Sequence, residues 1–312
     1  MKKTAFIFPG QGSQSVGMGQ EFYQEYDFVR ELFNMAEEIT KINISRLCFK
    51  GPIDELTMTV NLQPAVTAIN FACLAAIEKE GIKPDISAGH SLGEYSALGA
   101  SGVVSKEDIF RLVYKRGQLM HREATEHKGV MYAIVGLDIN TVTELVKEVQ
   151  KEGIVSVANH NAEQQIVITG TPDQVKAVAS LAADKGAKAV PLKVSGAWHS
   201  ELIKGAEDEF NKFLDSITFN APKSQIVLNV TGESSTDPDE IKSIMAQQLC
   251  SPVRWYDSMC KLAKEKVEIF VEVGPGTVLT GLLKKIVAKD YPCKIYNVNN
   301  MKRLEMFFKE VT

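Results

Sequence analysis

The stretch PDISAGHSLGEYSAL, residues 84–98, decides the fold. Its first part, Pro84 to Ala88, is an apolar run suited to a buried strand, and Glu94 to Leu98 is compatible with a helix. The residues between them fit the pattern Gly-x-Ser-x-Gly, in the strand-turn-helix context of a nucleophile elbow. Such a turn strains the serine backbone and brings other main chain close, which explains the glycines. The motif predicts a nucleophilic Ser91; the alternative is a glycine-rich turn in which Ser91 caps a helix.

Two other short strands lead into glycine-containing turns, at Thr4 to Phe8 and Val267 to Val273. Apolar residues at three- and four-residue spacing predict helices between the strands. These helices are Gln20 to Ile39, Gln63 to Lys79 with Pro64 in the first turn, and Lys106 to Ala124. Alternating strands and helices favour a parallel sheet with helices on both faces.

The middle of the chain has the element order βαββαβ, which matches the ferredoxin-like pattern. Its expected strands are Gly129 to Val135, Val155 to Ala158, Gln165 to Thr169 and Ala187 to Val194. Its expected helices are Thr141 to Lys151 and a second one capped by Thr171-Pro172 that ends at Lys185. We therefore expect a small domain at 127–196, inserted into an α/β domain formed by 1–126 and 197–312. In the larger domain, Thr231 to Glu240 is expected to be a surface turn before a helix at Ile241 to Leu249.

The composition is that of a globular protein, with 312 residues of which 45% are hydrophobic and 24% charged. It excludes disorder, collagen and coiled coil. A net charge of −4 gives no general attraction to nucleic acid or anionic lipid. We expect no tract of membrane-spanning length, and the apolar run Ala5 to Phe8 is too short for a signal peptide. Five scattered cysteines without a CxxC pair predict free thiols and a cytoplasmic location.

A serine nucleophile needs a base, and the spacing of the five histidines does not choose one. His160 and His199 are the better candidates. His199 lies in a loop of small residues at the return from the inserted domain, where a cleft would form. The alternative is a buried histidine that caps a helix beginning near Ser200. No histidine or cysteine spacing matches a metal site, so none is expected.

Several motifs together resemble the malonyl-CoA:acyl-carrier-protein transacylase family, in the family's order from Thr4 to about Lys289. They are FPGQGSQ at 8–14, GHSLGEYSAL at 89–98, Arg116-Gly117, AWHS at 197–200, Gln248-Leu249 with Pro252-Val253, and EVGPG at 272–276. The resemblance implies an α/β-hydrolase-like core with a ferredoxin-like insertion. It also implies an acyltransferase that works by a ping-pong mechanism through a malonyl-serine intermediate, for fatty-acid chain elongation.

The resemblance assigns roles at the reacting centre. Ser91 would be the nucleophile and His199 its base, oriented by the main-chain carbonyl of Gln248 rather than by a carboxylate. The backbone N–H groups of Gln11 and Leu92 would hold the oxyanion, and one such donor is typically worth about 3 kcal/mol.

The resemblance also assigns a substrate pocket. Arg116 would hold the free carboxylate of malonate, whereas the helix pattern alone favours a solvated charge. Trp198 stands where the family commonly has phenylalanine and would lie near the acyl pocket. Asn159 and Asn161 match a stretch that lines the cleft in relatives, although asparagines in a turn are equally well explained by local backbone hydrogen bonds.

Acyl carrier protein is the partner that the resemblance implies, as an acidic and transient one. Lys284 and Lys285, in the densest basic set near the end of the chain, are its expected landing area, and the alternative is a solvated helix face. No cofactor is expected on the enzyme; malonyl-CoA is the substrate, and acyl carrier protein carries the phosphopantetheine. Three alternatives stay open: a free-standing polyketide acyltransferase, a thioester hydrolase and a non-catalytic docking module.

Overall fold

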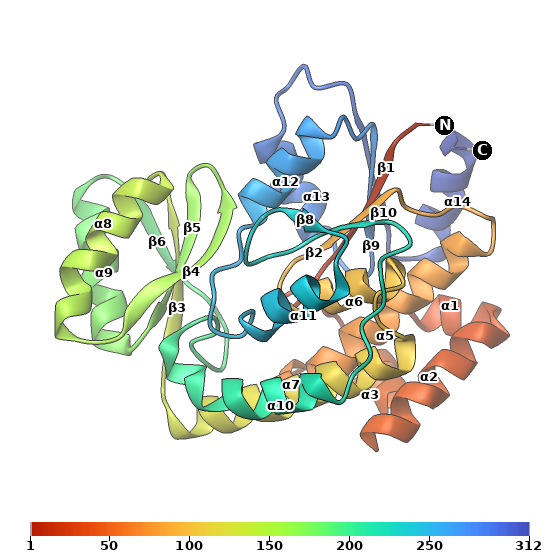
Figure 1. The fold of residues 1–312 in the computed structure, drawn as a ribbon, viewed down its shortest axis with the longest axis horizontal. Helices are drawn as coiled ribbons and strands as arrows, with labels where there is room; N and C mark the ends of the chain where they lie inside the picture. Colours follow the sequence, from red (N-terminus) through yellow and green to blue (C-terminus); the bar gives the residue numbers. More distant parts are fainter. Residues whose placement is uncertain (1, 312) are drawn as a thin grey trace.

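A six-stranded sheet of order β10-β9-β1-β2-β7-β8 forms the centre of the larger part of the molecule, in a computed structural model that describes residues 2–311 (Figure 1). All neighbours are parallel except β7 and β8, which are antiparallel. The strands are β1 (Thr4–Phe8), β2 (Ile86–Gly89), β7 (Gln225–Val227), β8 (Ser234–Ser235), β9 (Ile269–Val273) and β10 (Lys294–Val298). The predicted α/β fold with a parallel sheet is confirmed, and the predicted bounds of the first strand are correct.

Helices cover both faces of this sheet, as the side-chain alternation along β1 requires. Phe6 and Phe8 belong to the core on one face, and Ala5 and Ile7 belong to the core on the other. The second face is covered by α12 (Trp255–Lys264) and α13 (Val278–Ile286). The remaining helices of the larger part are α1 (Gln20–Glu25), α2 (Asp27–Thr40), α3 (Ile44–Lys50), α4 (Ile53–Thr57), α5 (Thr59–Glu78), α6 (Gly93–Ala100), α7 (Lys106–Glu126), η2 (Glu201–Ala206), α10 (Glu207–Asp215), α11 (Pro238–Ala246) and α14 (Met301–Val311).

Most predicted helices end within a few residues of the predicted bounds, such as α7 (Lys106–Glu126) and α8 (Ile139–Val149), and two near the start of the chain differ more. The expected helix from Gln20 to Ile39 is divided into two helices, α1 and α2, because the backbone of Tyr26 is extended rather than helical. The Tyr26 ring stacks on the ring of Phe28. The expected helix from Gln63 begins earlier, at Thr59, so Pro64 lies beyond the first turn. Apolar periodicity finds the buried face of a helix but does not locate its ends.

The region before Gln248 also differs from expectation. Helix α11 begins at Pro238 because the Asp237 side chain accepts hydrogen bonds from Asp239 N and Glu240 N, and it ends at Ala246. The predicted helix from Ile241 to Leu249 is therefore shifted, and Gln248 lies in the turn that follows α11. Strand β8 occupies part of the stretch that was expected to be a surface turn.

Helix α5 has the length and composition of a membrane-spanning segment, with 20 residues and a mean hydropathy of 1.5. The expectation that no tract has this length is therefore wrong. In the structure, 83% of its apolar window is buried inside the protein. Helix α5 packs against α2 and α7, so it is a core helix of the fold.

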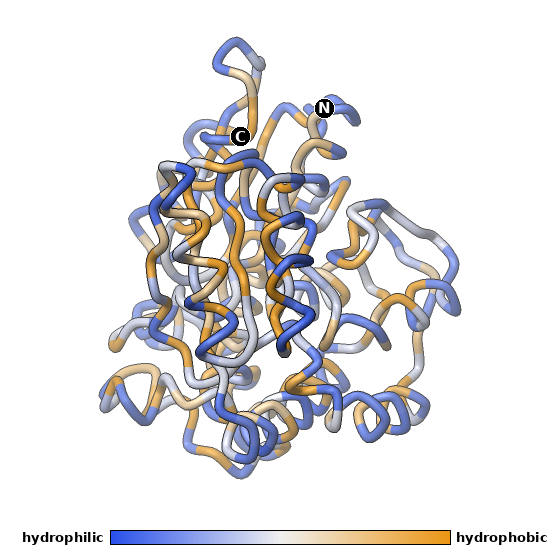
Figure 2. Tube along the Cα trace, turned by 90° about the vertical axis from the view of Figure 1, so that its left-hand side faces the viewer, coloured by the Kyte–Doolittle hydropathy of each residue, from blue (hydrophilic) through white to orange (hydrophobic). Residues whose placement is uncertain are grey.

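The smaller lobe is a four-stranded antiparallel sheet of order β4-β5-β3-β6 (Figure 1). Its elements are β3 (Val130–Val135), α8 (Ile139–Val149), η1 (Gln150–Glu152), β4 (Val155–Ala162), β5 (Gln165–Gly170), α9 (Pro172–Asp184) and β6 (Lys188–Pro191). Helices α8 and α9 share a separate apolar core with the sheet, and seen from the side of this lobe their hydrophilic and hydrophobic residues alternate (Figure 2). The predicted βαββαβ order is confirmed; the domain limits 127–196 stay a prediction.

Strand β4 joins the lobe to the larger part. It continues to Ala162, beyond the predicted end at Ala158, and bulges interrupt its pairing with β5. Its other edge meets Val253, whose N–H donates to Ala158 O at 2.8 Å and whose carbonyl accepts from His160 N at 2.9 Å. This contact holds β4 against the larger part, and Asn159 and Asn161 of the same strand line the cavity described below.

Candidate active site

The Gly-x-Ser-x-Gly motif forms a sharp turn between β2 and α6. Ser91 has a φ of 51°, in the left-handed region that non-glycine residues rarely adopt. A Cβ atom added to Gly89 would lie 2.0 Å from the backbone of Gly93, and one added to Gly93 would lie 1.9 Å from Phe8 O. Both glycines are therefore needed for the close approach of main chain. Ser91 is not the residue that caps α6, which begins after Leu92.

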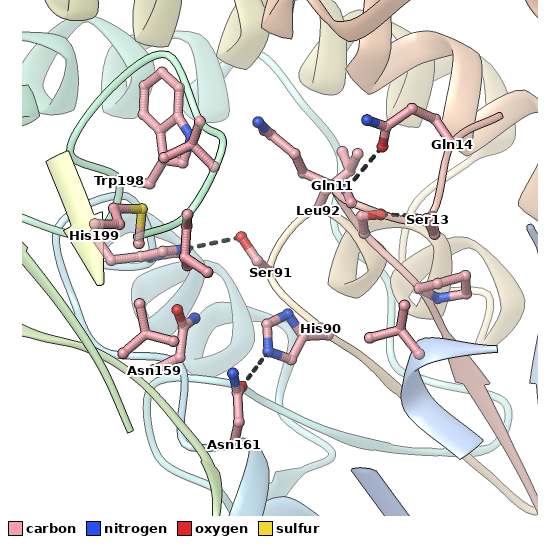
Figure 3. A pocket seen from close by; sticks show the side chains of 18 of the residues that line it. Gln11, Ser13, Gln14, His90, Ser91, Leu92, Asn159, Asn161, Trp198 and His199 are labelled. Carbon is pink, nitrogen blue, oxygen red and sulfur yellow. Dashed lines mark hydrogen bonds between the residues drawn. The ribbon is translucent and has the colours of Figure 1, made fainter. Parts of the chain in front are cut away.

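Ser91 and His199 are hydrogen-bonded across the pocket (Figure 3). The distance from Ser91 Oγ to His199 Nε2 is 2.8 Å, and His199 Nδ1 lies 3.1 Å from the main-chain carbonyl of Gln248. Because a carbonyl only accepts, Nδ1 carries the proton, and Nε2 is free to accept from the serine hydroxyl. Burial, with the positive charge of Arg116 beside it, lowers the pKa of His199 to about 3. The ring is thus neutral at pH 7 and able to take a proton.

The two alternatives, His160 as the base and His199 as a helix cap, do not fit this geometry. His160 lies on β4 with its ring 4.8 Å from the ring of Tyr256, away from Ser91. The short helix η2 after His199 is capped by Ser200, whose hydroxyl accepts from Leu202 N. The idea that His199 caps this helix is therefore wrong.

The candidate dyad opens onto a cavity of about 420 Å³ between the larger part and the lobe. Gln11 and Leu92 lie on one side of Ser91, and Trp198 lies on the side of His199 (Figure 3). A cavity of this size suits a small acyl group and the arm that delivers it. Its other lining residues include Gly10, Arg116, Met120, Met131, Asn159, Asn161, Gln165, Leu192, Lys193, Val278, Leu279 and Leu282.

Arg116 is one of the largest buried side chains, at 2% exposure, so the expectation of a solvated charge is wrong. Its Nη2 donates to Ser91 Oγ at 3.3 Å and its Nη1 to Gln63 Oε1 at 3.0 Å. The guanidinium also lies over the Tyr95 ring, 5.5 Å from the ring centre. Arg116 therefore presents a fixed positive charge beside the candidate nucleophile.

Asn159 and Asn161 lie within strand β4 and line the cavity, so the alternative that they belong to a turn is wrong. Asn161 Oδ1 is 2.7 Å from His90 Nε2, which links the lobe to the elbow. Trp198 is 4% exposed. A Cβ on Gly196 would lie 2.7 Å from its indole, so Gly196 makes room for the larger ring.

The loop after β1 packs directly on the elbow. A Cβ on Gly10 would lie 2.5 Å from His90 O, so the two turns meet main chain to main chain. Gln11 and Leu92 both line the cavity beside Ser91. That their N–H groups converge on an oxyanion stays a prediction.

Lys284 and Lys285 are in the last turn of α13, outside the cavity. Both are exposed, and Lys285 Nζ donates to Gln165 Oε1 at 3.0 Å. Gln165 and the first turns of α13 line the cavity, so Lys285 lies beside it, whereas Lys284 lines a separate hollow with Thr280 and Tyr296.

The sequence interpretation missed two residues that hold the site together. Gln63 fixes Arg116 and donates to Thr59 Oγ1 at 3.0 Å. Asn229 accepts from Ser91 N at 2.7 Å. Gln63 is one of the few polar residues in a mostly apolar helical run, which was a signal in the sequence, whereas nothing in the sequence near Asn229 distinguishes it.

An elbow serine, a neutral histidine and a buried cationic pocket on an α/β-hydrolase-like sheet define an acyl-transfer enzyme. The chain belongs to the acyl transferase family, whose model for an acyl transferase domain matches residues 5–306, and to its malonyl CoA-acyl carrier protein transacylases.

Curated relatives and solved structures agree on this family. The malonyl CoA-acyl carrier protein transacylase of Bacillus subtilis is 43% identical, over 92% of this chain and 91% of its own. An acyl carrier protein S-malonyltransferase from Vibrio cholerae is 38% identical, with a TM-score of 0.93 over 98% of this chain and 99% of its own. A malonyl-transacylase in complex with a type II PKS acyl-carrier protein is 35% identical, with a TM-score of 0.94 over 99% of both chains.

Proposed function

We propose that this enzyme transfers the malonyl group of malonyl-CoA to the phosphopantetheine thiol of acyl carrier protein, for fatty-acid chain elongation. The observation that carries the proposal is the buried Arg116 guanidinium 3.3 Å from Ser91 Oγ. In malonyl-CoA the free carboxylate carbon is two bonds from the carbonyl carbon that a serine would attack. A cation at this place therefore suits a malonyl group better than an acyl group without a carboxylate.

The first half-reaction forms a malonyl-serine ester. Ser91 Oγ attacks the thioester carbonyl while its proton passes to His199 Nε2, and the N–H groups of Gln11 and Leu92 stabilise the oxyanion. The C–S bond then breaks, and His199 returns the proton to the leaving thiolate of coenzyme A. The Gln248 carbonyl holds the imidazole in the tautomer that these steps need.

The second half-reaction reverses these roles. The phosphopantetheine thiol attacks the ester carbonyl, its proton passes to His199, and the Ser91 oxygen leaves and regains a proton from His199. Atoms and charges balance without a cofactor bound to the enzyme. Trp198, Asn159 and Asn161 would line the path of the acyl group and the arm, since all three border the cavity.

The experiment that tests this function is labelling with radioactive malonyl-CoA, followed by mapping of the labelled peptide. We expect one labelled peptide that contains Ser91 and loss of the label to a carrier protein. The Ser91→Ala variant should take up no label. Label lost to water rather than to any carrier would support a thioester hydrolase, and absence of label would support a non-catalytic module.

A set of fatty-acid and polyketide carrier proteins distinguishes the first alternative. Acceptance of a polyketide carrier alone would favour a free-standing polyketide acyltransferase. One structural neighbour was solved with such a carrier, so both kinds belong in the assay. The cytoplasmic location is proposed on the five cysteines, which are unpaired in the structure.

We propose Lys284 and Lys285 as part of the landing area for the acidic, transient carrier protein. The double variant Lys284→Glu/Lys285→Glu should raise the KM for carrier protein about tenfold, because like charges now repel at the end of α13, the helix whose first turns line the cavity. The rate of the first half-reaction with malonyl-CoA should stay the same. Steady-state kinetics with varied carrier protein, at low and moderate salt, measures both.

A matched control is Lys147→Glu/Lys151→Glu, which makes the same change in net charge at exposed positions in and after α8 of the lobe. This control should leave the KM for carrier protein within about twofold of the wild type. Equal increases in both double variants would mean that net charge matters and that the landing area lies elsewhere.

A further inference from the structure

Glu94, in the first turn of α6, has a carboxylate that is completely buried, and none of the steps above uses it. Its Oε1 accepts from the main-chain N–H of Asn229 at 2.6 Å, and its Oε2 accepts from Gln248 Nε2 at 2.7 Å. Hydrogen bonds to an ionised acceptor are about twice as strong as neutral ones. With two such bonds, the buried carboxylate joins the start of α6 to Asn229 and Gln248, which lie far from it in the sequence.

Both residues that Glu94 holds bind the backbone of the candidate nucleophile. Asn229 Oδ1 accepts from Ser91 N at 2.7 Å, and Asn229 Nδ2 donates to Gly89 O at 2.6 Å. Gln248 Nε2 donates to Ser91 O at 2.8 Å. The strained Ser91 thus has both its N–H and its carbonyl held by the side-chain amides of two residues that the same carboxylate binds, Asn229 through its backbone and Gln248 through its side chain.

The same carboxylate also acts on the candidate base. The main-chain carbonyl of Gln248 accepts from His199 Nδ1, so the side chain of Gln248 is tied to Glu94 while its backbone orients the imidazole. Asn229 and Gln248 both lie in turns, where no regular ladder of backbone hydrogen bonds fixes their positions. Without Glu94, the N–H of Asn229 would lose its acceptor, and the Gln248 side chain would be left with its contacts to Ser91 O and Tyr95 Oη.

We propose that Glu94 is a positioning residue for acyl transfer. It fixes the positions of Ser91 and His199 relative to each other, through its bonds to Asn229 and Gln248. Glu94 is not among the residues that line the cavity, and its carboxylate binds Asn229 and Gln248. Burial raises the pKa of Glu94 to about 7, and the bonds from Asn229 and Gln248 oppose this increase by stabilising the ionised form. This inference rests on the proposed function only in taking malonyl-CoA as the natural substrate; the positioning of Ser91 and His199 does not depend on which acyl group is transferred.

The test is the Glu94→Gln variant, which keeps the shape but replaces one of the two acceptor oxygens with an NH2 group, so that either Asn229 N or Gln248 Nε2 faces a second donor. We expect the rate of Ser91 acylation by malonyl-CoA to fall at least 30-fold with KM within threefold, since a misplacement of about 1 Å can cost 10²-fold in rate. The reaction of Ser91 with a fluorophosphonate, which needs the dyad but no malonyl pocket, should slow to a similar extent. If the wild type reacts with the fluorophosphonate but not with malonyl-CoA, the proposed function fails and this second probe still tests Glu94.

The matched control is Glu272→Gln. Glu272 is also a fully buried carboxylate, and it accepts from Leu279 N at 3.0 Å and Thr280 N at 2.8 Å, at the start of α13. We expect Glu272→Gln to lower the melting temperature as Glu94→Gln does, while Ser91 reacts with the fluorophosphonate within threefold of the wild-type rate. Equal slowing in both variants, or a Glu94→Gln rate within threefold of wild type, would overturn the proposal.

A second variant keeps the test decisive if Glu94→Gln does not fold. Gln248→Met removes the side-chain amide but leaves the carbonyl that faces His199. The proposal predicts a loss of at least tenfold in the acylation rate, and, where Glu94→Gln folds, a double variant that is no slower than the slower single variant. An unchanged rate in Gln248→Met would show that only its backbone matters and would refute the positioning role.

Discussion

The His199→Ala variant is expected to acylate Ser91 about 10⁴-fold more slowly than the wild type, with malonyl-CoA and acetyl-CoA alike. The reason is that Nε2, 2.8 Å from Ser91 Oγ, is the group that takes the hydroxyl proton for any acyl donor. Single-turnover kinetics with each thioester measures the loss. A loss with one thioester only would mean that His199 recognises the acyl group rather than serving as the base.

His127→Ala is the control, since His127 is an exposed histidine just after α7. We expect its single-turnover rates to match those of the wild type. Because both variants remove one imidazole, a common loss would point to a general effect on folding. Circular dichroism of each variant separates that case.

The pH dependence of stability gives a second measure of the state of His199. Its pKa is about 3 in the folded protein, against an ordinary value near 6.5 in the unfolded chain. As the pH falls from about 6.5 toward 4, the unfolded state binds a proton that the native ring does not, so the native state loses stability. The free energy of unfolding of the wild type, minus that of His199→Ala, should therefore decrease over this range. An increase would mean that the ring is charged in the native state.

The parts of this molecule that could be predicted from sequence are those governed by local chemistry. The apolar run Thr4–Phe8 is a strand with all five residues buried, and the glycines around Ser91 mark a turn where any side chain would collide with backbone. In such places the preference of a few neighbouring residues decides the structure, and tertiary packing agrees with it. The choice between His160 and His199 needed the family resemblance, because the two rings are placed by loops and by the edge of a sheet.

What could not be predicted depends on contacts between distant segments. Gln63 and Arg116 meet because α5 packs on α7, and Asn229 reaches Ser91 from a turn 138 residues further along the chain. The start of α11 depends on the side-chain cap at Asp237, which apolar periodicity does not register. Glu94 is set apart by burial rather than by residue type, since an acidic residue in the first turn of a helix is ordinary on a surface.

The Arg116→Ala variant should lose malonyl transfer about 10²- to 10³-fold while acetyl transfer changes less than fivefold. The size of the effect is that of removing one partner from a buried, charge-assisted pair, about 3–4 kcal/mol. An acetyl group has no carboxylate, so its transfer loses only the contacts that the guanidinium makes with the protein, such as the one to Ser91 Oγ, and malonyl transfer loses these as well. The ratio of the two kcat/KM values measures this selectivity directly.

Two features of the site shape the design of this experiment. Arg116 lowers the pKa of His199, so removing it moves that pKa upward, and the comparison belongs at pH 8, where the imidazole is neutral in both proteins. Removing Arg116 also leaves Gln63 Oε1 without its donor, a structural cost that falls on both substrates equally. Arg111→Ala, at an exposed position of the same helix paired with Glu107, supplies the control and should leave the ratio unchanged. Equal losses of malonyl and acetyl transfer in Arg116→Ala would contradict recognition of the malonyl carboxylate, because a carboxylate receptor affects only the substrate that has one.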